Sequence, residues 1–395
     1  MTSAATRGSI GLVLSGGGAR GAYEVGALLH IADHLPELLA RIRVITGTSV
    51  GAVNGAFLAC RGVTPAGVHE LAEIWGGLTM DELVRIDRDG VRQLLAAGGK
   101  RLIGRLAKSP PIGVLDVSGI SRLVQERADW RALRRVVRSG RLDAVGFAAT
   151  DIATGRTRLF VDHARGLAPR WPKGDDAAEP EGVVFGPSHV LASAAIPLLF
   201  PPVRVGTRWY VDGGVRYNTP LAPALGLGAE SLLIVSVGTA AVGNRAVASD
   251  DFPGFGQVVG KVLDSVFLDR VAFDLDRLTR INDIVEAVDA LGEDTLTRLR
   301  GELQRRKRPA YRPVRYAHVR PSFDLGALAS EHLERAAKGA GRFSFARVLS
   351  ALFQDDAGTS GDAASFLLFD SGYAKTLMEV GRRDAEATHE ELARL

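Results

Sequence analysis

The stretch Gly11–Gly26, GLVLSGGGARGAYEVG, indicates the fold class of this chain. A short apolar run ends in three glycines, and residues 21–40 then alternate apolar and polar side chains at helical spacing. A short apolar run that ends in glycine is typical of a buried strand in a parallel sheet. The stretch therefore predicts a strand, a glycine-rich loop and a helix, in that order.

The residues that follow repeat this order. RIRVITG (41–47) predicts a second strand, and SVGAVNGAFLACRG (49–62) predicts a second helix. Alternating strands and helices favour an α/β fold with a mostly parallel sheet. Further strands are expected at 143–151, 156–162, 203–213, 231–238 and 314–321.

Two regions interrupt this pattern. Residues 76–142 are rich in arginine and predict a helical insertion, whereas residues 163–187 carry glycine, proline and mixed charge and predict a loop. Residues 253–300 and 331–395 predict further helices.

The second strand–helix junction has the pattern of a catalytic serine turn. Gly47-Thr48-Ser49-Val50-Gly51 reads G-x-S-x-G. A serine on a sharp, strained turn needs glycine at the flanking positions, where a side chain would clash. The following helix then directs its positive N-terminal end at the serine oxygen, where charge develops in acyl transfer. The pattern favours Ser49 as a nucleophile over a plain tight turn.

The glycines of the first loop allow two interpretations. Gly16 to Gly21 satisfy G-x-G-x-x-G, which occurs in dinucleotide sites. Such a site also needs an acidic residue at the end of the second strand, to bind a ribose hydroxyl. Asp33 lies inside the first predicted helix, and the second strand ends in glycine and hydroxyl residues. The loop is therefore better suited to donate backbone N–H groups to an oxyanion beside Ser49.

A serine nucleophile needs a base, and the sequence offers several candidates. His189 is the best placed of the eight histidines, while His318 falls inside a predicted strand. Asp212 is a stronger candidate because it ends a predicted strand and precedes Gly213 and Gly214, which permit close backbone approach. An aspartate before two glycines is also common in plain turns, so the local pattern leaves both roles open.

Four elements in this order, GGGARG (16–21), GTSVG (47–51), ASAAIPLLFPPV (192–203) and DGGVRYNTP (212–220), resemble the patatin-like phospholipase family. The resemblance runs from about Gly8 to about Gly238, and no motif position departs from it. It implies a three-layer α/β/α fold and a serine–aspartate dyad that hydrolyses acyl esters of lipids. Carried over by position, Ser49 is the nucleophile and Asp212, with Gly213 and Gly214, forms the base motif. The N–H groups of Gly16, Gly17 and Gly18 form the oxyanion hole, and Arg20 closes the same loop.

The resemblance implies a phospholipase A type of carboxylic ester hydrolase that needs neither a cofactor nor a metal. Lysophospholipase, thioesterase and general esterase activities remain alternatives, because the same site serves them all. A nucleotide-binding enzyme and a non-catalytic interaction protein are the alternatives of other classes. We expect a catalytic domain over residues 8–325, with its insertion at about 76–142, and a helical extension over residues 326–395.

Composition and charge set limits on partners. The chain of 395 residues has a formal charge of +4, and its single cysteine, Cys60, excludes an intramolecular disulfide and reads as a small buried hydrophobe. No signal peptide or membrane-spanning run is evident, which favours a cytoplasmic protein that meets membranes only at their surface. Nucleic-acid binding is not expected, because basic runs such as RRKRP (305–309) lack interleaved aromatic residues.

Three apolar segments have open roles. An apolar helical face over 256–278 would pack in the core, lie on a membrane or form a homodimer contact. The basic, apolar segment KRLIGRLAK (100–108) is the better candidate for a lipid surface. ASAAIPLLFPPV (192–203) would line an acyl-chain groove or belong to the core under the sheet.

Overall fold

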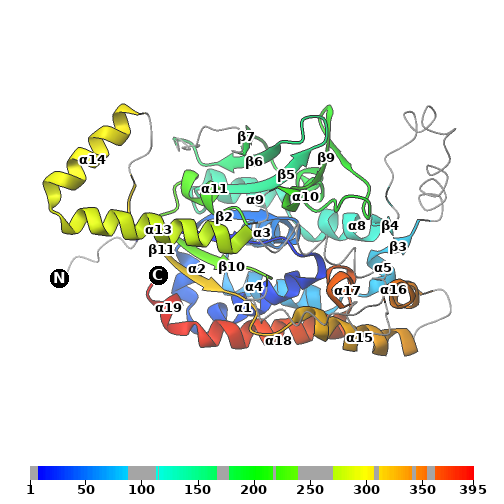
Figure 1. Ribbon diagram of the computed structural model, residues 1–395. Helices are drawn as coiled ribbons and strands as arrows, with labels where there is room; N and C mark the ends of the chain where they lie inside the picture. Colours follow the sequence, from blue (N-terminus) through cyan, green and yellow to red (C-terminus); the bar gives the residue numbers. More distant parts are fainter. Residues whose placement is uncertain are drawn as a thin grey trace, which may run out of the picture.

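A computed structural model describes residues 8–87, 113, 115–166, 178–216, 219–238, 270–306, 311–339, 344–353 and 361–395. These residues form one body of helices around a central sheet (Figure 1). The fold is α/β with a mostly parallel sheet, as the strand–helix alternation predicted.

Nine strands of the described chain make up the central sheet. In chain order they are β1 (Ile10–Leu14), β2 (Ile42–Thr48), β5 (Ala144–Asp151), β6 (Thr157–His163), β7 (Glu179–Gly182), β8 (Val203–Val205), β9 (Arg208–Asp212), β10 (Ser231–Val235) and β11 (Arg315–Val319). The main order across the sheet is β11-β10-β1-β2-β5-β6-β7, and β8 and β9 form a hairpin that joins it at β5. The pairings from β11 to β5 are all parallel, whereas β6 and β9 run antiparallel to β5.

Helices lie on both faces of this sheet or, in one case, extend away from it (Figure 1). In the first half of the chain they are α1 (Gly21–His34), α2 (Pro36–Ala40), α3 (Val50–Cys60), α4 (Pro65–Gly76), α5 (Met80–Leu83), α8 (Ser118–Arg127), α9 (Trp130–Arg138) and α10 (Pro187–Ser193). In the second half they are α11 (Leu221–Gly226), α13 (Arg270–Ala290), α14 (Glu293–Arg305), α15 (Leu325–Gly339), α16 (Phe345–Phe353), α17 (Gly361–Leu367), α18 (Ser371–Ala387) and α19 (His389–Ala393).

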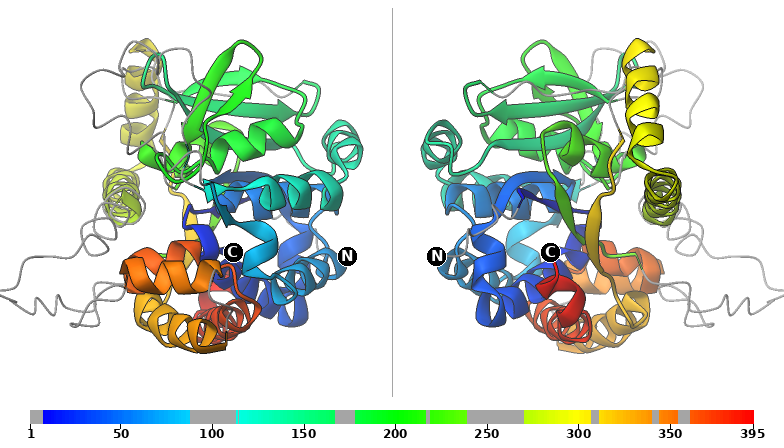
Figure 2. Two further views of the ribbon diagram at one scale, coloured as in Figure 1. Left: turned by 90° about the vertical axis from the view of Figure 1, so that its right-hand side faces the viewer. Right: turned by 90° about the vertical axis from the view of Figure 1, so that its left-hand side faces the viewer.

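The alternation of side chains along β1 creates two cores. Leu12 and Leu14 pack into the larger core, which includes residues of α1, α3, α4 and the C-terminal helices. Val13 points to the other face, where it packs with residues of α11 and α13. The sheet thus lies between two helical layers, which Figure 2 shows from two sides.

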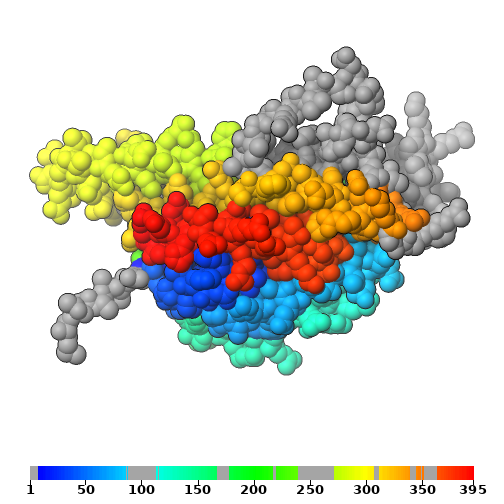
Figure 3. All heavy atoms as spheres, turned by 90° about the horizontal axis from the view of Figure 1, so that it is seen from below, coloured from blue at the N-terminus to red at the C-terminus, as the bar shows by residue number. Residues whose placement is uncertain are grey.

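The C-terminal helices belong to the larger core. α18 lies against α1, and Figure 3 shows the C-terminal segment as a band across the N-terminal helices. Their backbones approach closely where glycines face the partner helix, because a Cβ on Gly26 would overlap Met378 and one on Gly381 would overlap Tyr23. Leu395, at the C-terminus, is also buried in this core. The predicted division of the chain at residue 326 stays a prediction.

Replacing Gly381 by alanine is expected to lower the free energy of unfolding by about 1–3 kcal/mol. The added Cβ would meet backbone atoms of α1, which cannot rotate away as a side chain would. Urea unfolding measures the effect. Gly301→Ala in α14 is the matched control, since nothing lies near its Cβ position, and the higher helix propensity of alanine predicts a gain of up to about 1 kcal/mol. Equal stability of Gly381→Ala and wild type would contradict the close packing.

Several elements differ from the sequence predictions. Residues 203–213 form the β8–β9 hairpin and not one strand, because the chain turns at Gly206, whose φ is +59°. The predicted helix after the glycine loop breaks at Leu35, since Pro36 starts α2. The 163–187 region contains β7, paired with β6, and the 76–142 region contains the two-stranded sheet of β3 (Arg85–Ile86) and β4 (Leu115–Asp116).

Some sequence predictions lie outside the described residues. These are the basic segment 100–108, and the apolar face over 256–278 as far as residue 269. In the part of the chain that the structure describes, none of the helices has the length and apolar character needed to cross a membrane.

Candidate active site

The register along β5 brings Ser49 and Asp212 together. β2 pairs with β5 as far as Thr48 opposite Ala148, and β9 pairs with β5 from Asp212 opposite Ala149. The two strands therefore run toward each other along β5, and both end at the junction. Ser49 follows the last residue of β2, so its side chain comes next to the carboxylate that ends β9.

Ser49 occupies a strained turn between β2 and α3. Its φ of 55° and ψ of −124° lie outside the regions that residues with a side chain prefer. Glycine is required on both sides, because a Cβ on Gly47 would collide with the Gly51 backbone, and one on Gly51 with the Leu14 and Ser15 carbonyl oxygens. The turn is thus packed tightly against the end of β1, and Ser49 caps the positive end of α3.

Asp212 is fully buried, and its carboxyl has two different oxygen environments. Oδ1 accepts a hydrogen bond of 2.7 Å from the Gly214 amide, whereas Oδ2 has no partner of normal length among the described residues. Burial raises the pKa of Asp212 to about 7, and hydrogen bonding from Ser49 and from the Gly214 amide opposes this rise. The Ser49 hydroxyl is thus near the carboxylate without a tight hydrogen bond, as is common in sites without substrate.

The glycine-rich loop follows β1, beside the Ser49 turn. Gly17 and Gly18 allow close packing, because a Cβ on Gly17 would overlap Val237 and one on Gly18 would overlap the Phe366 carbonyl oxygen. Gly18 lines the same pocket as Ser49. Gly16 and Gly17 complete the turn that leads from β1 into the short 3-10 helix Gly18–Arg20.

Arg20 connects the glycine loop to the C-terminal helix α17. Its Nε donates a hydrogen bond of 2.7 Å to Ser365 Oγ, and its guanidinium lies 4.2 Å from the centre of the Phe366 ring. The side chain is buried at this contact. The sequence prediction placed Arg20 at the oxyanion loop, and the geometry gives its guanidinium these contacts to α17, which hold the loop in place.

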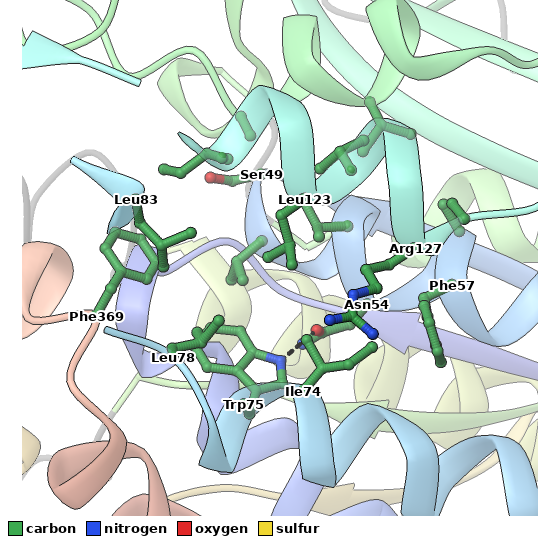
Figure 4. Close-up of a pocket in the computed structure, with 18 of the residues that line it drawn as sticks. Ser49, Asn54, Phe57, Ile74, Trp75, Leu78, Leu83, Leu123, Arg127 and Phe369 are labelled. Carbon is green, nitrogen blue, oxygen red and sulfur yellow. Dashed lines mark hydrogen bonds between the residues drawn. The ribbon is translucent and has the colours of Figure 1, made fainter. Parts of the chain in front are cut away.

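Ser49 is part of the lining of an apolar pocket. It encloses about 840 Å³ of atom-free space, a volume that includes the solvent at its open side. In Figure 4, Ser49 lies at one end of the labelled side chains, and Ile74, Trp75 and Phe57 lie toward the other. Its apolar lining includes Val53, Phe57, Ile74, Trp75, Leu78, Leu123, Phe200 and Phe369.

Sequence reasoning missed two groups of residues at this site. Ser193, the only polar residue in ASAAIPLLFPPV, accepts a hydrogen bond of 3.0 Å from the Ser49 amide, and its isolation in an apolar stretch was an available signal. In the wall of the pocket, Asn54 Oδ1 accepts a hydrogen bond from Trp75 Nε1, and Asn54 Nδ2 donates one to the buried Glu24. Burial raises the pKa of Glu24, and no local pattern marks this network.

The two histidines and the cysteine that the sequence singled out make contacts of their own. His189 packs against Phe160 and Phe185, and its Nδ1 accepts a hydrogen bond of 3.1 Å from the Gly186 amide. His318 lies 2.8 Å from Ser236 Oγ, and burial lowers the pKa of His318 to about 4. Cys60 is buried, as predicted, and burial raises the pKa of its thiol to about 12. Within the described ranges, no three His, Cys, Asp or Glu side chains are grouped so as to hold a metal.

A serine on a glycine-flanked turn between a parallel strand and a helix, in the lining of an apolar pocket, is an arrangement suited to a serine hydrolase of apolar esters. The chain belongs to the patatin-like phospholipase family, whose sequence model matches residues 12–225, more than half of its length. Membership of this family supports the assignment of the chain as a lipid ester hydrolase.

Solved structures with a similar fold are distant. A human GIVD cytosolic phospholipase A2 is 12% identical with a TM-score of 0.40, over 98% of this chain and 60% of that chain. VipD from Legionella pneumophila is 16% identical with a TM-score of 0.36, over 92% and 67% of the two chains. ExoU from Pseudomonas aeruginosa, in complex with SpcU, is 18% identical with a TM-score of 0.29, over 98% and 76%.

Proposed function

We propose that this protein hydrolyses carboxylic esters of phospholipids, with Ser49 as nucleophile and Asp212 as its base. The observation that carries the proposal is the end-to-end meeting of β2 and β9, beside a buried carboxylate at Asp212 and a strained serine, Ser49, that lines an apolar pocket. A buried carboxylate with a pKa of about 7 is suited to accept a proton near neutral pH.

The first step transfers the acyl group to Ser49. Ser49 Oγ attacks the ester carbonyl carbon, and Asp212 Oδ2 accepts the hydroxyl proton. The N–H groups of the Gly16–Gly18 loop and the N-terminal end of α3 stabilise the negative oxygen of the tetrahedral intermediate. One well-placed donor raises the rate by roughly 10²–10³-fold. When the intermediate collapses, the bond to the alcohol oxygen breaks and Asp212 returns the proton to the leaving lysophospholipid.

The second step releases the fatty acid. Asp212 accepts a proton from a water molecule, whose oxygen attacks the acyl carbon on Ser49. The bond to Ser49 Oγ breaks, and the proton on Asp212 returns to the serine. The acyl chain lies throughout in the pocket between α3, α4 and α8, where burial of its methylene groups contributes to binding.

Fatty-acid release from phospholipid vesicles tests the proposal. Wild type is expected to release fatty acid together with an equal amount of lysophospholipid. Release from lysophospholipid but not from vesicles would indicate a lysophospholipase, and cleavage of only short soluble esters or thioesters would indicate an esterase or thioesterase. A folded wild type that cleaves none of these would contradict the proposal and favour a binding protein. An upward shift in melting temperature with NAD or ATP would favour the nucleotide-binding alternative.

The pH dependence of kcat/KM is expected to follow the ionisation of Asp212. The carboxyl acts as a base only when it is deprotonated, so activity falls about tenfold per pH unit below the pKa of about 7 and reaches a plateau above it. A soluble neutral ester is the appropriate substrate, because it does not titrate in this range. Full activity two pH units below this pKa would contradict the role of Asp212.

Replacing Ile74 by tryptophan is expected to shorten the acyl pocket. Ile74 lines it on α4, so the larger side chain would exclude long chains, and hydrolysis of a palmitoyl ester should fall about tenfold or more while that of a butyryl ester stays nearly constant. The ratio of the two kcat/KM values is the measurement. Glu73→Gln, the neighbouring position outside this apolar lining, is the control. An unchanged ratio would show that the acyl chain binds elsewhere.

A further inference from the structure

The end of α10 contacts both residues of the proposed dyad. Ser193 Oγ accepts a hydrogen bond of 3.0 Å from the Ser49 amide and donates one of 2.6 Å to the Ala148 carbonyl oxygen. Two residues further along, the Ala195 carbonyl oxygen accepts a hydrogen bond of 2.8 Å from the Asp212 amide. One short segment is therefore bonded to the backbones of Ser49 and Asp212.

The bond from the Ser49 amide bears on a strained residue. Ser49 is only 2% exposed and has a positive φ, so its backbone keeps this conformation only if its surroundings fix it. The structure gives the Ser49 amide a hydrogen bond to Ser193 Oγ, a side chain with no exposed surface. The Ser49 amide already donates its hydrogen bond to Ser193. The Ser193 hydroxyl therefore affects the position of Ser49 and not the charge of the reacting ester.

The same hydroxyl is tied to the strand that aligns the dyad. Ala148 lies on β5 opposite Thr48, and the next residue, Ala149, lies opposite Asp212. A Cβ on Gly213 would overlap the Ala148 carbonyl oxygen, so the chain after Asp212 also packs at this point. The Asp212 carbonyl oxygen accepts a hydrogen bond of 3.0 Å from Thr150 Oγ1 on the same strand. Ser193 is thus located where the ends of β2 and β9 and the middle of β5 converge.

We propose that Ser193 is a positioning residue, which holds the Ser49 backbone at the distance from Asp212 that proton transfer needs. The inference rests on the proposed function, because it takes Ser49 and Asp212 as the reacting pair. It adds a role for the segment ASAAIPLLFPPV (192–203). Ala194, Ile196 and Phe200 line the pocket, whereas Ser193 aligns the dyad.

A fluorophosphonate provides a test that does not depend on the natural lipid. Ser49 Oγ forms a bond to phosphorus, the P–F bond breaks, and fluoride leaves while Asp212 accepts the proton. The labelling rate constant and the number of labelled sites are measured for wild type, Ser193→Ala and Ser193→Cys, alongside kcat and KM on a soluble ester. Ser231→Ala is the matched control, since Ser231 is also buried but lies at the other end of the sheet, opposite Ile10.

In Ser193→Ala, labelling rate and kcat are expected to fall together by about 10- to 100-fold, the scale of an ångström-sized misplacement. KM should stay constant, and the pH profile should keep its midpoint near 7, because the burial of Asp212 is not altered. Ser193→Cys fills the same space with a weaker acceptor and should lie between Ser193→Ala and wild type, which also provides the test if Ser193→Ala does not fold. Ser231→Ala should label at the wild-type rate.

Two results would overturn the positioning role. One is a wild-type labelling rate in both Ser193 variants. The other is a smaller number of labelled sites with an unchanged rate per site, which would mean that the hydroxyl only stabilises the fold. Failure of the proposed function gives a different result, in which wild type and Ser49→Ala are labelled equally, and that outcome removes the positioning role as well.

Discussion

Replacing Ser49 by alanine is expected to lower the rate of ester hydrolysis by about 10⁴-fold or more. In the proposed mechanism, the substitution removes the only atom that forms the acyl–enzyme bond and leaves the glycine loop and the pocket in place. Binding of an apolar ester should therefore persist, because the apolar residues that line the pocket are unchanged. Fatty-acid release from vesicles, together with fluorophosphonate labelling, measures the loss.

The Ser49→Ala experiment needs a control for general effects of losing a buried hydroxyl. Ser231→Ala provides it, since this serine starts β10, at the end of the sheet remote from the glycine loop. Its activity should equal that of wild type. Substantial hydrolysis by folded Ser49→Ala would mean that another nucleophile acts, and the Ser236–His318 pair would be the first to replace.

Replacing Asp212 by asparagine is expected to inactivate the enzyme and, at alkaline pH, to stabilise its fold. The loss of activity should reach about 10³- to 10⁴-fold, because an amide cannot accept the Ser49 proton. The gain in stability has a separate cause. Folding carries the Asp212 carboxylate from water into a fully buried position, and the variant carries no charge there.

The sign of the stability effect follows from the direction of the pKa change. Burial raises the pKa of Asp212 from the ordinary 3.8 to about 7, so the folded protein holds this proton more tightly than the unfolded chain does. Below about pH 4 both states are protonated, and the aspartate has no penalty. Between the two pKa values wild type loses stability as the pH rises. Above about pH 7 the free energy of unfolding of wild type stays lower by a constant amount, up to roughly 4 kcal/mol.

Urea unfolding of wild type and Asp212→Asn at about pH 4 and about pH 9 measures this difference. The two proteins should have similar stability at the lower pH, and the variant should be more stable at the higher one. Glu24→Gln is a useful comparison, because burial also raises the pKa of that carboxyl, at a position outside the proposed dyad. An Asp212→Asn variant that is less stable than wild type at alkaline pH would contradict the raised pKa.

The sequence by itself determined the features that depend on neighbouring residues. The apolar run before Gly16 and the glycines around Ser49 predicted β1, β2 and the strained turn, because strand formation and left-handed backbone depend on a few adjacent side chains. The order of four motifs identified the family. The same local reasoning was wrong for residues 203–213, where a turn between β8 and β9 divides what reads as one run.

Only the tertiary structure decided which distant residues meet. Ser193 contacts Ser49 across 144 positions of sequence, and Ser365 contacts Arg20 across 345, so no periodicity or spacing could indicate either bond. The alignment of Ser49 with Asp212 likewise depends on strand register along β5. Register is set by how whole faces of side chains pack against one another, which is a property of the assembled sheet and not of any single stretch.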